Sequence, residues 1–122
     1  MAKRIMVVDD DPRIQMAVRN VLESRKYEVQ SALSGRECLE KLETKGLPDL
    51  VLLDIMMEDM DGQTAFYKIV KKYPKLKVVF ISALQPSEDS KLIMKAKGAE
   101  VMSITKPFTM ELLLNTVKKA LG

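Results

Sequence analysis

The sequence from Asp49 to Gly62 reads D-L-V-L-L-D-I-M-M-E-D-M-D-G. Its apolar run from Leu50 to Leu53 is short enough for a buried strand and too short for a helix of its own. A strand without polar alternation fits a parallel sheet that is covered on both faces. The run stops at Asp54, and a carboxylate directly after such a strand lies at the carboxyl edge of the sheet, where open α/β folds bind their ligands. Asp54 is therefore the first candidate for a functional residue.

The composition limits both the size of the fold and its chemistry. A chain of 122 residues with 47% hydrophobic content is predicted to form one domain, residues 1–122, with an ample core. Cys38 is the only cysteine and histidine is absent. This excludes an internal disulfide framework, histidine acid–base chemistry and a Ser-His-Asp triad, and it argues against a structural zinc site.

The net charge and the terminal segments bear on the cellular location and the partners of the protein. The net charge of +3 is modest and does not by itself favour nucleic acid or a membrane. The apolar run directly after Arg4 is only four residues long, so no signal peptide is expected. No apolar run in the sequence is long enough to span a membrane. We also expect no DNA-binding helix-turn-helix beyond Gly122. We therefore expect a soluble, reduced, cytoplasmic protein without direct nucleic-acid or membrane contacts.

Strand and helix patterns alternate along the whole chain. Besides the central strand, apolar or alternating segments predict strands at residues 5–8, 27–30, 78–81 and 101–104. Helical spacing, Pro12 at a first turn and Ser34 as a cap predict helices over residues 12–25, 34–46, 63–73, 86–97 and 108–121.

Five strands alternating with five helices predict an α/β fold: a single doubly wound (βα)5 flavodoxin-like domain, with helices on both faces of a parallel five-stranded sheet. Right-handed crossovers favour the strand order 2-1-3-4-5. In that order the first, third and fourth strands are adjacent. Their carboxyl ends carry Asp9 with Asp10, Asp54, and Ser82, and the fifth strand adds Lys106.

This set of side chains favours phosphoryl chemistry. Asp9, Asp10 and Asp54 would repel one another, and a divalent cation such as Mg²⁺, which prefers oxygen ligands, would relieve that repulsion. Lys106 can bind a phosphoryl oxygen and Ser82 can donate a hydrogen bond to another. Metal and ammonium together would neutralise the charge that develops in phosphoryl transfer, and Asp54 is the carboxylate best placed to be the nucleophile. An ion pair of Lys106 with the acids is also expected in the resting state.

These motifs, in this order, resemble the response regulator receiver domain over essentially the whole chain. The matching elements are the Asp9-Asp10 pair, the pattern D-x-x-M-x-x-M-D-G that starts at Asp54, Ser82-Ala83, and Lys106-Pro107-Phe108.

The resemblance implies a role for each residue of the edge. Asp54 would accept a phosphoryl group from a sensor histidine kinase or phosphotransfer protein, and Ser82 and Lys106 would bind that group. Asp10 would ligate Mg²⁺ directly, Asp9 mostly through water, and the backbone carbonyl of Met56 would be a further ligand. Such a domain catalyses only its own phosphorylation and dephosphorylation. It switches the surface around the fourth helix and fifth strand for a downstream protein, here unidentified.

The sequence departs from the family pattern at several positions. Glu58 stands where proline is usual, Ser103 stands where an aromatic residue is usual, and the segment between Ser82 and Lys106 is slightly long. Met56 and Leu84 flank the path of attacking water in the family, and their apolar side chains predict slow self-dephosphorylation. Without an aromatic at 103, we expect the signal to pass through residues 83–97.

The strand position of Met102 leaves two arrangements open. In a regular fifth strand, its side chain projects to the face opposite that of Ser103. A bulge would instead bring it across to the same face.

Three other interpretations fit the residues less well. A haloacid-dehalogenase-like phosphatase needs a second Asp where Met56 stands, and a flavin phosphate would be repelled by the acids after the first strand. The segment from Asp59 to Gly62 matches a calcium loop incompletely. The basic run after residue 67 is interpreted as a solvated face; its members are Lys68, Lys71, Lys72, Lys75 and Lys77.

Overall fold

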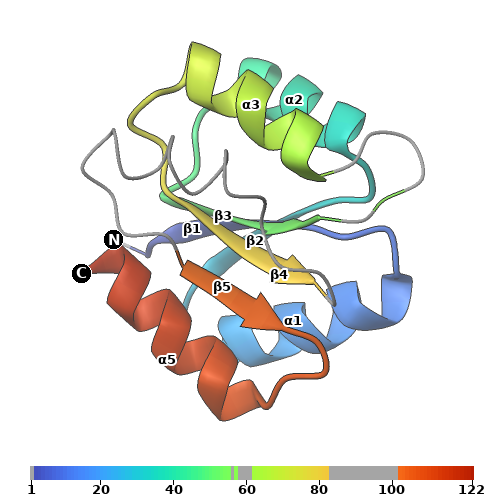
Figure 1. Cartoon of the computed structure of the whole chain (residues 1–122). Coiled ribbons are helices and arrows are strands. Elements are labelled where there is room, and N and C mark those ends of the chain that lie inside the picture. Colours follow the sequence, from blue (N-terminus) through green and yellow to red (C-terminus); the bar gives the residue numbers. More distant parts are fainter. Residues whose placement is uncertain (1, 56, 58–61, 83–101) are drawn as a thin grey trace.

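The computed structural model describes residues 2–55, 57, 62–82 and 102–122, with only the backbone for Ser82 (Figure 1). The strands are β1 (Arg4–Val8), β2 (Glu28–Ala32), β3 (Leu50–Asp54), β4 (Val78–Ser82) and β5 (Met102–Thr105). The helices in the described part are α1 (Pro12–Ser24), α2 (Gly35–Thr44), α3 (Gly62–Lys72) and α5 (Met110–Leu121). The helix predicted over residues 86–97 lies outside the described residues.

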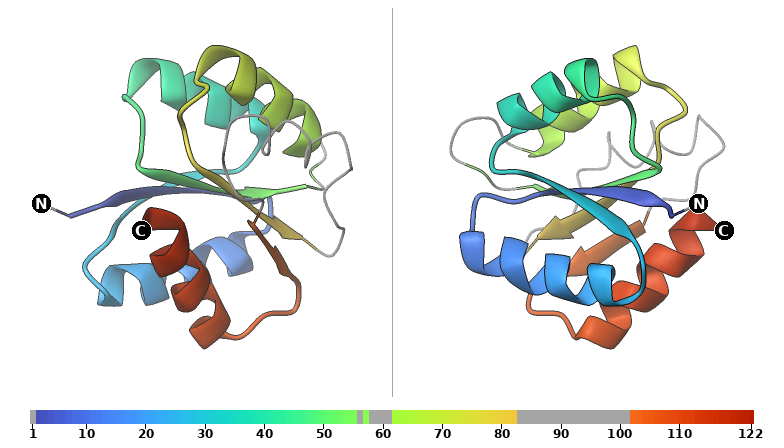
Figure 2. Two further views of the ribbon diagram at one scale, coloured as in Figure 1. Left: turned by 60° about the vertical axis from the view of Figure 1, so that its left-hand side comes forward. Right: turned by 180° about the vertical axis from the view of Figure 1, so that it is seen from behind.

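The five strands form one parallel sheet in the order β2-β1-β3-β4-β5, which confirms the predicted topology. Helices α1 and α5 cover one face of the sheet, and α2 and α3 cover the other (Figures 1 and 2). In the pairing of β1 with β3, Val8 lies opposite Leu53. The residues that follow these two strands therefore leave the sheet side by side.

Side-chain alternation along the central strands divides the core into two layers. Met6 and Val8 belong to the cluster beneath α2 and α3, whereas Ile5 and Val7 belong to the cluster against α1 and α5. Because both faces are covered, these strands read as continuous apolar runs. Each fully buried large apolar side chain contributes about 1.5–3 kcal/mol to the free energy of unfolding, so the core stabilises the strands whose ends carry the acidic residues.

The helix starts are set by capping side chains. The side chain of Ser34 accepts a hydrogen bond from the backbone N–H of Glu37, which confirms the predicted cap of α2. Thr109 accepts in the same way from the N–H of Leu112, so α5 begins at Met110 and not at Phe108 as predicted. This hydroxyl satisfies a backbone donor that the first turn of the helix leaves unpaired.

The strand β5 is regular over its described length. Its register with β4 runs without interruption from Met102 opposite Val79 to Thr105 opposite Ser82. Met102 packs against the cluster beneath α1 and α5, and Ser103 is exposed. A bulge that brings Met102 to the face of Ser103 is therefore wrong for residues 102–105, and the regular arrangement is confirmed.

No helix within the described ranges is long and apolar enough to cross a membrane.

Candidate functional site

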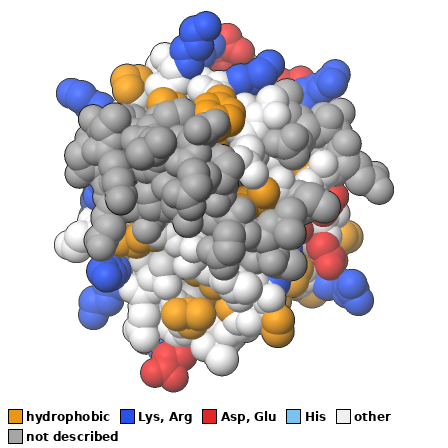
Figure 3. All heavy atoms as spheres, in the orientation of Figure 1, with side chains coloured by type: hydrophobic (Ala, Val, Ile, Leu, Met, Phe, Trp, Pro, Cys, Tyr) orange, Lys and Arg blue, Asp and Glu red, His pale blue; other side chains and the backbone are white. Residues whose placement is uncertain are grey.

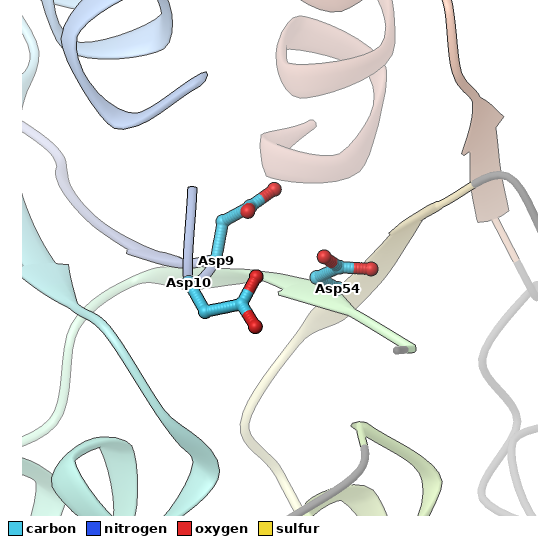
Figure 4. Close-up of side chains that lie close together, drawn as sticks. All are labelled: Asp9, Asp10 and Asp54. Atoms are coloured by element: carbon cyan, nitrogen blue, oxygen red, sulfur yellow. The ribbon is translucent and has the colours of Figure 1, made fainter. Parts of the chain in front are cut away.

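Three carboxylates meet at the carboxyl edge of the sheet. Asp9 and Asp10 directly follow β1, and Asp54 is the last residue of the neighbouring strand β3. One carboxylate oxygen from each of the three lies within 4.8 Å of the other two. Figure 4 shows the three side chains close together at the carboxyl ends of the two strands. The predicted convergence of Asp9, Asp10 and Asp54 is thus observed.

Lys106 reaches the acids from the turn after β5. Its Nζ donates a hydrogen bond to Oδ2 of Asp9 at 2.7 Å and to Oδ2 of Asp54 at 3.3 Å. The Lys106 side chain is 22% exposed, against 0% for Asp9 and 5% for Asp54. The predicted resting ion pair is therefore present, and it is shared between two acids from different strands.

Burial and mutual contact shift the pKa values of Asp9 and Lys106. Burial raises the pKa of Asp9, opposed by the hydrogen bond from Lys106 and by the backbone N–H of Asp11. The pKa of Lys106 is raised: burial acts against this, but the hydrogen bond and charge of Asp9, with the charge of Asp54, outweigh it. Lys106 is consequently an ammonium at neutral pH. Among the described residues, the Lys106 ammonium pairs with two of the three clustered carboxylates, so the cluster keeps negative charge that a further cation could neutralise.

The two acids after β1 differ in what their oxygens contact. Asp9 is buried, with Oδ1 accepting from the backbone N–H of Asp11 at 2.9 Å and Oδ2 accepting from Lys106. The side chain of Asp10 is exposed. The protein therefore already holds both oxygens of Asp9, whereas Asp10 presents its carboxylate to solvent beside Asp54.

Gly62 begins α3 against the end of β3, a role that was not identified from the sequence. Its N–H donates to the carbonyl oxygen of Ile55 at 2.6 Å. A Cβ at this position would lie 1.9 Å from the carbonyl oxygen of Asp54 and 2.6 Å from Cα of Ile55. Only glycine allows α3 to begin this close to the backbone of Asp54. The Asp61-Gly62 pair ahead of a helix was the available signal.

The structure leaves part of the predicted site undescribed. The backbone of Ser82 ends β4 opposite Thr105, so the residue lies at the same edge as Asp54. Its hydroxyl is outside the described part of the structure, as are Met56 with its carbonyl, and Leu84.

The last three lysines of the basic run lie at the other end of the sheet. Lys72 pairs with Glu43 at 3.0 Å and lies over the ring of Tyr73. Lys75 and Lys77 border an open groove of about 490 Å³, whose floor includes Pro48 and Leu76 and which lies at the amino ends of the strands. On the face that Figure 3 shows, Lys and Arg side chains are spread around the periphery. All five lysines of the run are exposed, as expected of a solvated face, and Lys72, Lys75 and Lys77 line the groove at the end of the sheet away from the acidic cluster.

Comparisons with known proteins give a single result. The family model "Response regulator receiver domain" matches residues 5–118. The chain is 32% identical to Chemotaxis protein CheY of Thermotoga maritima, over 98% of both chains. It is 34% identical to part of Sensor kinase CckA of Brucella abortus, covering 96% of this chain and 12% of that kinase.

Solved structures agree with the sequence matches. The structure of response regulator protein TrrA from Thermotoga maritima, in complex with Mg²⁺-BeF, superimposes with a TM-score of 0.83 at 32% identity, covering 97% of this chain and 98% of that one. A CheY-like receiver domain protein from Methanospirillum hungatei gives a TM-score of 0.85 at 32% identity, with coverage of 99% and 94%.

Proposed function

The chain belongs to the response regulator receiver family, and from that membership we propose the residues, the metal and the partners through which it acts. The domain is a phosphoacceptor of two-component signalling. It is a signalling receiver, and the matches reported above give no support to a haloacid-dehalogenase-like phosphatase. We take residues 1–122 as one receiver domain.

Asp54 is the proposed phosphoacceptor. An oxygen of its carboxylate forms a bond to the phosphorus of a phosphohistidine, and the bond from phosphorus to the imidazole nitrogen breaks. That nitrogen keeps the electron pair, and because the other ring nitrogen of the phosphohistidine carries a proton, the histidine leaves as the neutral ring. The observation that supports this assignment is the Lys106 ammonium 3.3 Å from Oδ2 of Asp54, at the end of the central strand. An ammonium there can neutralise charge on the transferred group, and the hydroxyl of Ser82 is proposed to donate to it.

The residues present fit a divalent cation, and Mg²⁺ is the proposed ion. Asp10 and Asp54 would hold it directly, and Asp9, whose two oxygens already accept hydrogen bonds, would hold it through water. The carbonyl of Met56 is the further ligand that family membership implies. When bound, Mg²⁺ would offset the negative charge of the carboxylates and of the phosphoryl group. The Mg²⁺-BeF complex of TrrA supports this choice.

The proposed partners are a sensor histidine kinase or phosphotransfer protein upstream and an unidentified protein downstream. The downstream protein would recognise the surface around the fourth helix and β5. Ser103 is exposed and small, so we propose that residues 83–97 carry the change without an aromatic rotamer switch. Amide hydrogen exchange with and without beryllofluoride tests this: a response confined to β5 would contradict it.

The experiment that tests the phosphoacceptor uses intact-mass measurement with Mg²⁺ and a small acyl phosphate. The wild-type chain should gain one phosphoryl group, and Asp54→Asn should gain none. The matched control is Asp49→Asn, which changes an exposed Asp at the opposite end of β3 and should be modified as readily as wild type. An adduct of undiminished yield on Asp54→Asn would exclude this residue as the acceptor.

A further inference from the structure

Gln15 is a polar residue on the core-facing side of α1, only 7% exposed. It lies in the first turn of the helix, three residues before the buried Val18. Its Nε2 is 2.9 Å from the carbonyl oxygen of Val7, 3.0 Å from that of Asp9 and 2.9 Å from that of Ala32. One side-chain amide group thus contacts three backbone carbonyls at the ends of β1 and β2.

The orientation of this amide follows from its surroundings. If the group were reversed, Oε1 would face three carbonyl oxygens, with no hydrogen to share among them. With Nε2 in place, two N–H groups serve three acceptors, so at least one hydrogen bond is shared. Oε1 is buried and has no hydrogen-bond partner in the described part of the structure, which costs stability. If the only role of Gln15 were to fill the core, an apolar residue of similar size would therefore stabilise the fold better.

Two of the three carbonyls, those of Val7 and Asp9, belong to the segment that carries the acidic pair, and the third, that of Ala32, ends the neighbouring strand β2. The N–H of Asp9 donates to the carbonyl of Ala32 at 3.1 Å, which is the last backbone bond between β1 and the end of β2. Beyond it, Gln15 holds the carbonyl of Asp9, and hence the peptide that joins Asp9 to Asp10. The side chain of Asp9 is held separately by the N–H of Asp11 and by Lys106.

We propose that Gln15 is a positioning residue for the metal site, because its side-chain amide orients the Asp9–Asp10 peptide and so the direction of both carboxylates. The inference rests on the proposed function, in which these acids bind a divalent cation. Gln15 does not touch the metal or the phosphoryl group; it acts through the main chain of the two ligands. Groups that orient metal ligands from outside typically change metal affinity by about 10- to 100-fold when they are removed.

The competing explanation is that Gln15 merely attaches α1 to the sheet. Both explanations predict a loss of stability on substitution, but only positioning predicts a loss of metal affinity beyond that caused by an equally destabilising change elsewhere in α1. Val18→Ala is the matched control. It removes buried apolar atoms from the same face of the helix and leaves the three carbonyl contacts intact.

The test compares Gln15→Met, which keeps the length of the side chain and removes its donors, with Val18→Ala and wild type. Mg²⁺ affinity is measured by titration calorimetry and stability by urea unfolding without metal. We expect Gln15→Met to bind Mg²⁺ at least about 10-fold more weakly than wild type. Val18→Ala should bind Mg²⁺ with an affinity within about 2-fold of wild type, because substitutions at independent sites rarely change one another's energetics by more than that. Faster amide exchange at Asp10 and Asp11 in metal-free Gln15→Met, but not in Val18→Ala, is the second expected result.

Each outcome decides between the possibilities. Wild type that binds no Mg²⁺ would refute the proposed function itself. Wild type that binds Mg²⁺ together with a folded Gln15→Met that binds it equally well would refute only the role of Gln15. So would an equal loss of affinity in Val18→Ala. If Gln15→Met does not fold, Gln15→Asn keeps the amide but shortens it by one methylene, and it should show a loss smaller than 10-fold; unchanged affinity there would also refute the inference.

Discussion

The two ends of the sheet both carry many charges, but they place them in opposite environments. At the carboxyl ends of the strands, Asp9 and Asp54 are buried and share Lys106, which is itself largely enclosed. At the amino ends, Lys75 and Lys77 are exposed beside an open groove, and within the described residues neither forms an ion pair.

The difference shows that charge density alone does not identify a functional site. Exposed charges are screened by water and salt and contribute little to stability. Buried charges interact strongly because the local dielectric constant is low, and the fold must hold each one in place. Substitutions at the carboxyl end should therefore have large effects and those at the amino end small ones.

The largest effect is expected for Gly62→Ala. The new Cβ would lie 1.9 Å from the carbonyl oxygen of Asp54, so either α3 or the end of β3 must shift. We expect the free energy of unfolding to fall by about 3 kcal/mol, the upper range for overpacking a rigid site. Urea unfolding measures this, with Gly46→Ala at the other end of the sheet as a comparison for backbone strain alone. A stability equal to wild type would mean that the contact relaxes freely.

Lys106→Met should have the next largest effect. It leaves Asp9 and Asp54 buried without their ammonium partner, so the metal-free protein should lose about 2 kcal/mol at pH 7. This is less than for a fully buried pair because the Lys106 side chain is 22% exposed. Thermal unfolding with and without Mg²⁺ is the measurement, and Mg²⁺ should recover part of the loss. If the variant is as stable as wild type without metal, the ion pair does not contribute.

Asp9→Asn should have a smaller effect of opposite sign, which depends on pH. Because burial raises the folded-state pKa of Asp9 above its ordinary value of 3.8, the folded protein binds this proton more tightly than the unfolded chain does. That contribution to stability is complete below pH 3.8 and is lost as the pH rises through the folded-state pKa.

Metal-free wild type should therefore lose stability relative to Asp9→Asn between pH 3 and pH 7. Urea unfolding in the presence of a chelator, repeated across this pH range, measures the difference. A difference that shrinks with rising pH would contradict the sign of the shift. With Mg²⁺ present the order should reverse, because the variant has lost a carboxylate of the proposed site.

The smallest effect is expected at the amino end. The double substitution Lys75→Gln with Lys77→Gln removes two exposed charges that are unpaired within the described structure. We expect the free energy of unfolding to change by less than about 0.5 kcal/mol and phosphorylation by a small acyl phosphate to proceed at the wild-type rate. A slower reaction would show that the two ends of the sheet are coupled and that the comparison above is incomplete.

Much of the site could be predicted from the sequence because parallel strands end at a common edge. The apolar run from Leu50 to Leu53 indicated a strand covered on both faces, and the alternation of strands and helices implied the order of the sheet. Polar residues that directly follow two neighbouring strands must then lie near each other. Asp9, Asp10 and Asp54 satisfy this condition, and their convergence is observed.

The ends of the elements were predicted less accurately than their order. The strand predicted over residues 27–30 is observed at Glu28–Ala32, because its pairing with β1 and not its own alternation determines where it starts and stops. The last helix begins at Met110 because the Thr109 side chain caps it.

The sequence by itself determined which residues meet at the edge of the sheet, since alternating strand and helix patterns leave few topologies. Only the tertiary structure decided which acid is buried, and that Lys106 lies closer to Asp9 than to Asp54. It also decided that Gly62 must lack a side chain and that Gln15 contacts three carbonyls. The roles of Gly62 and Gln15 depend on how closely α3 and α1 approach the strand ends. That approach is set by packing between segments far apart in the chain, which no local pattern of residues encodes.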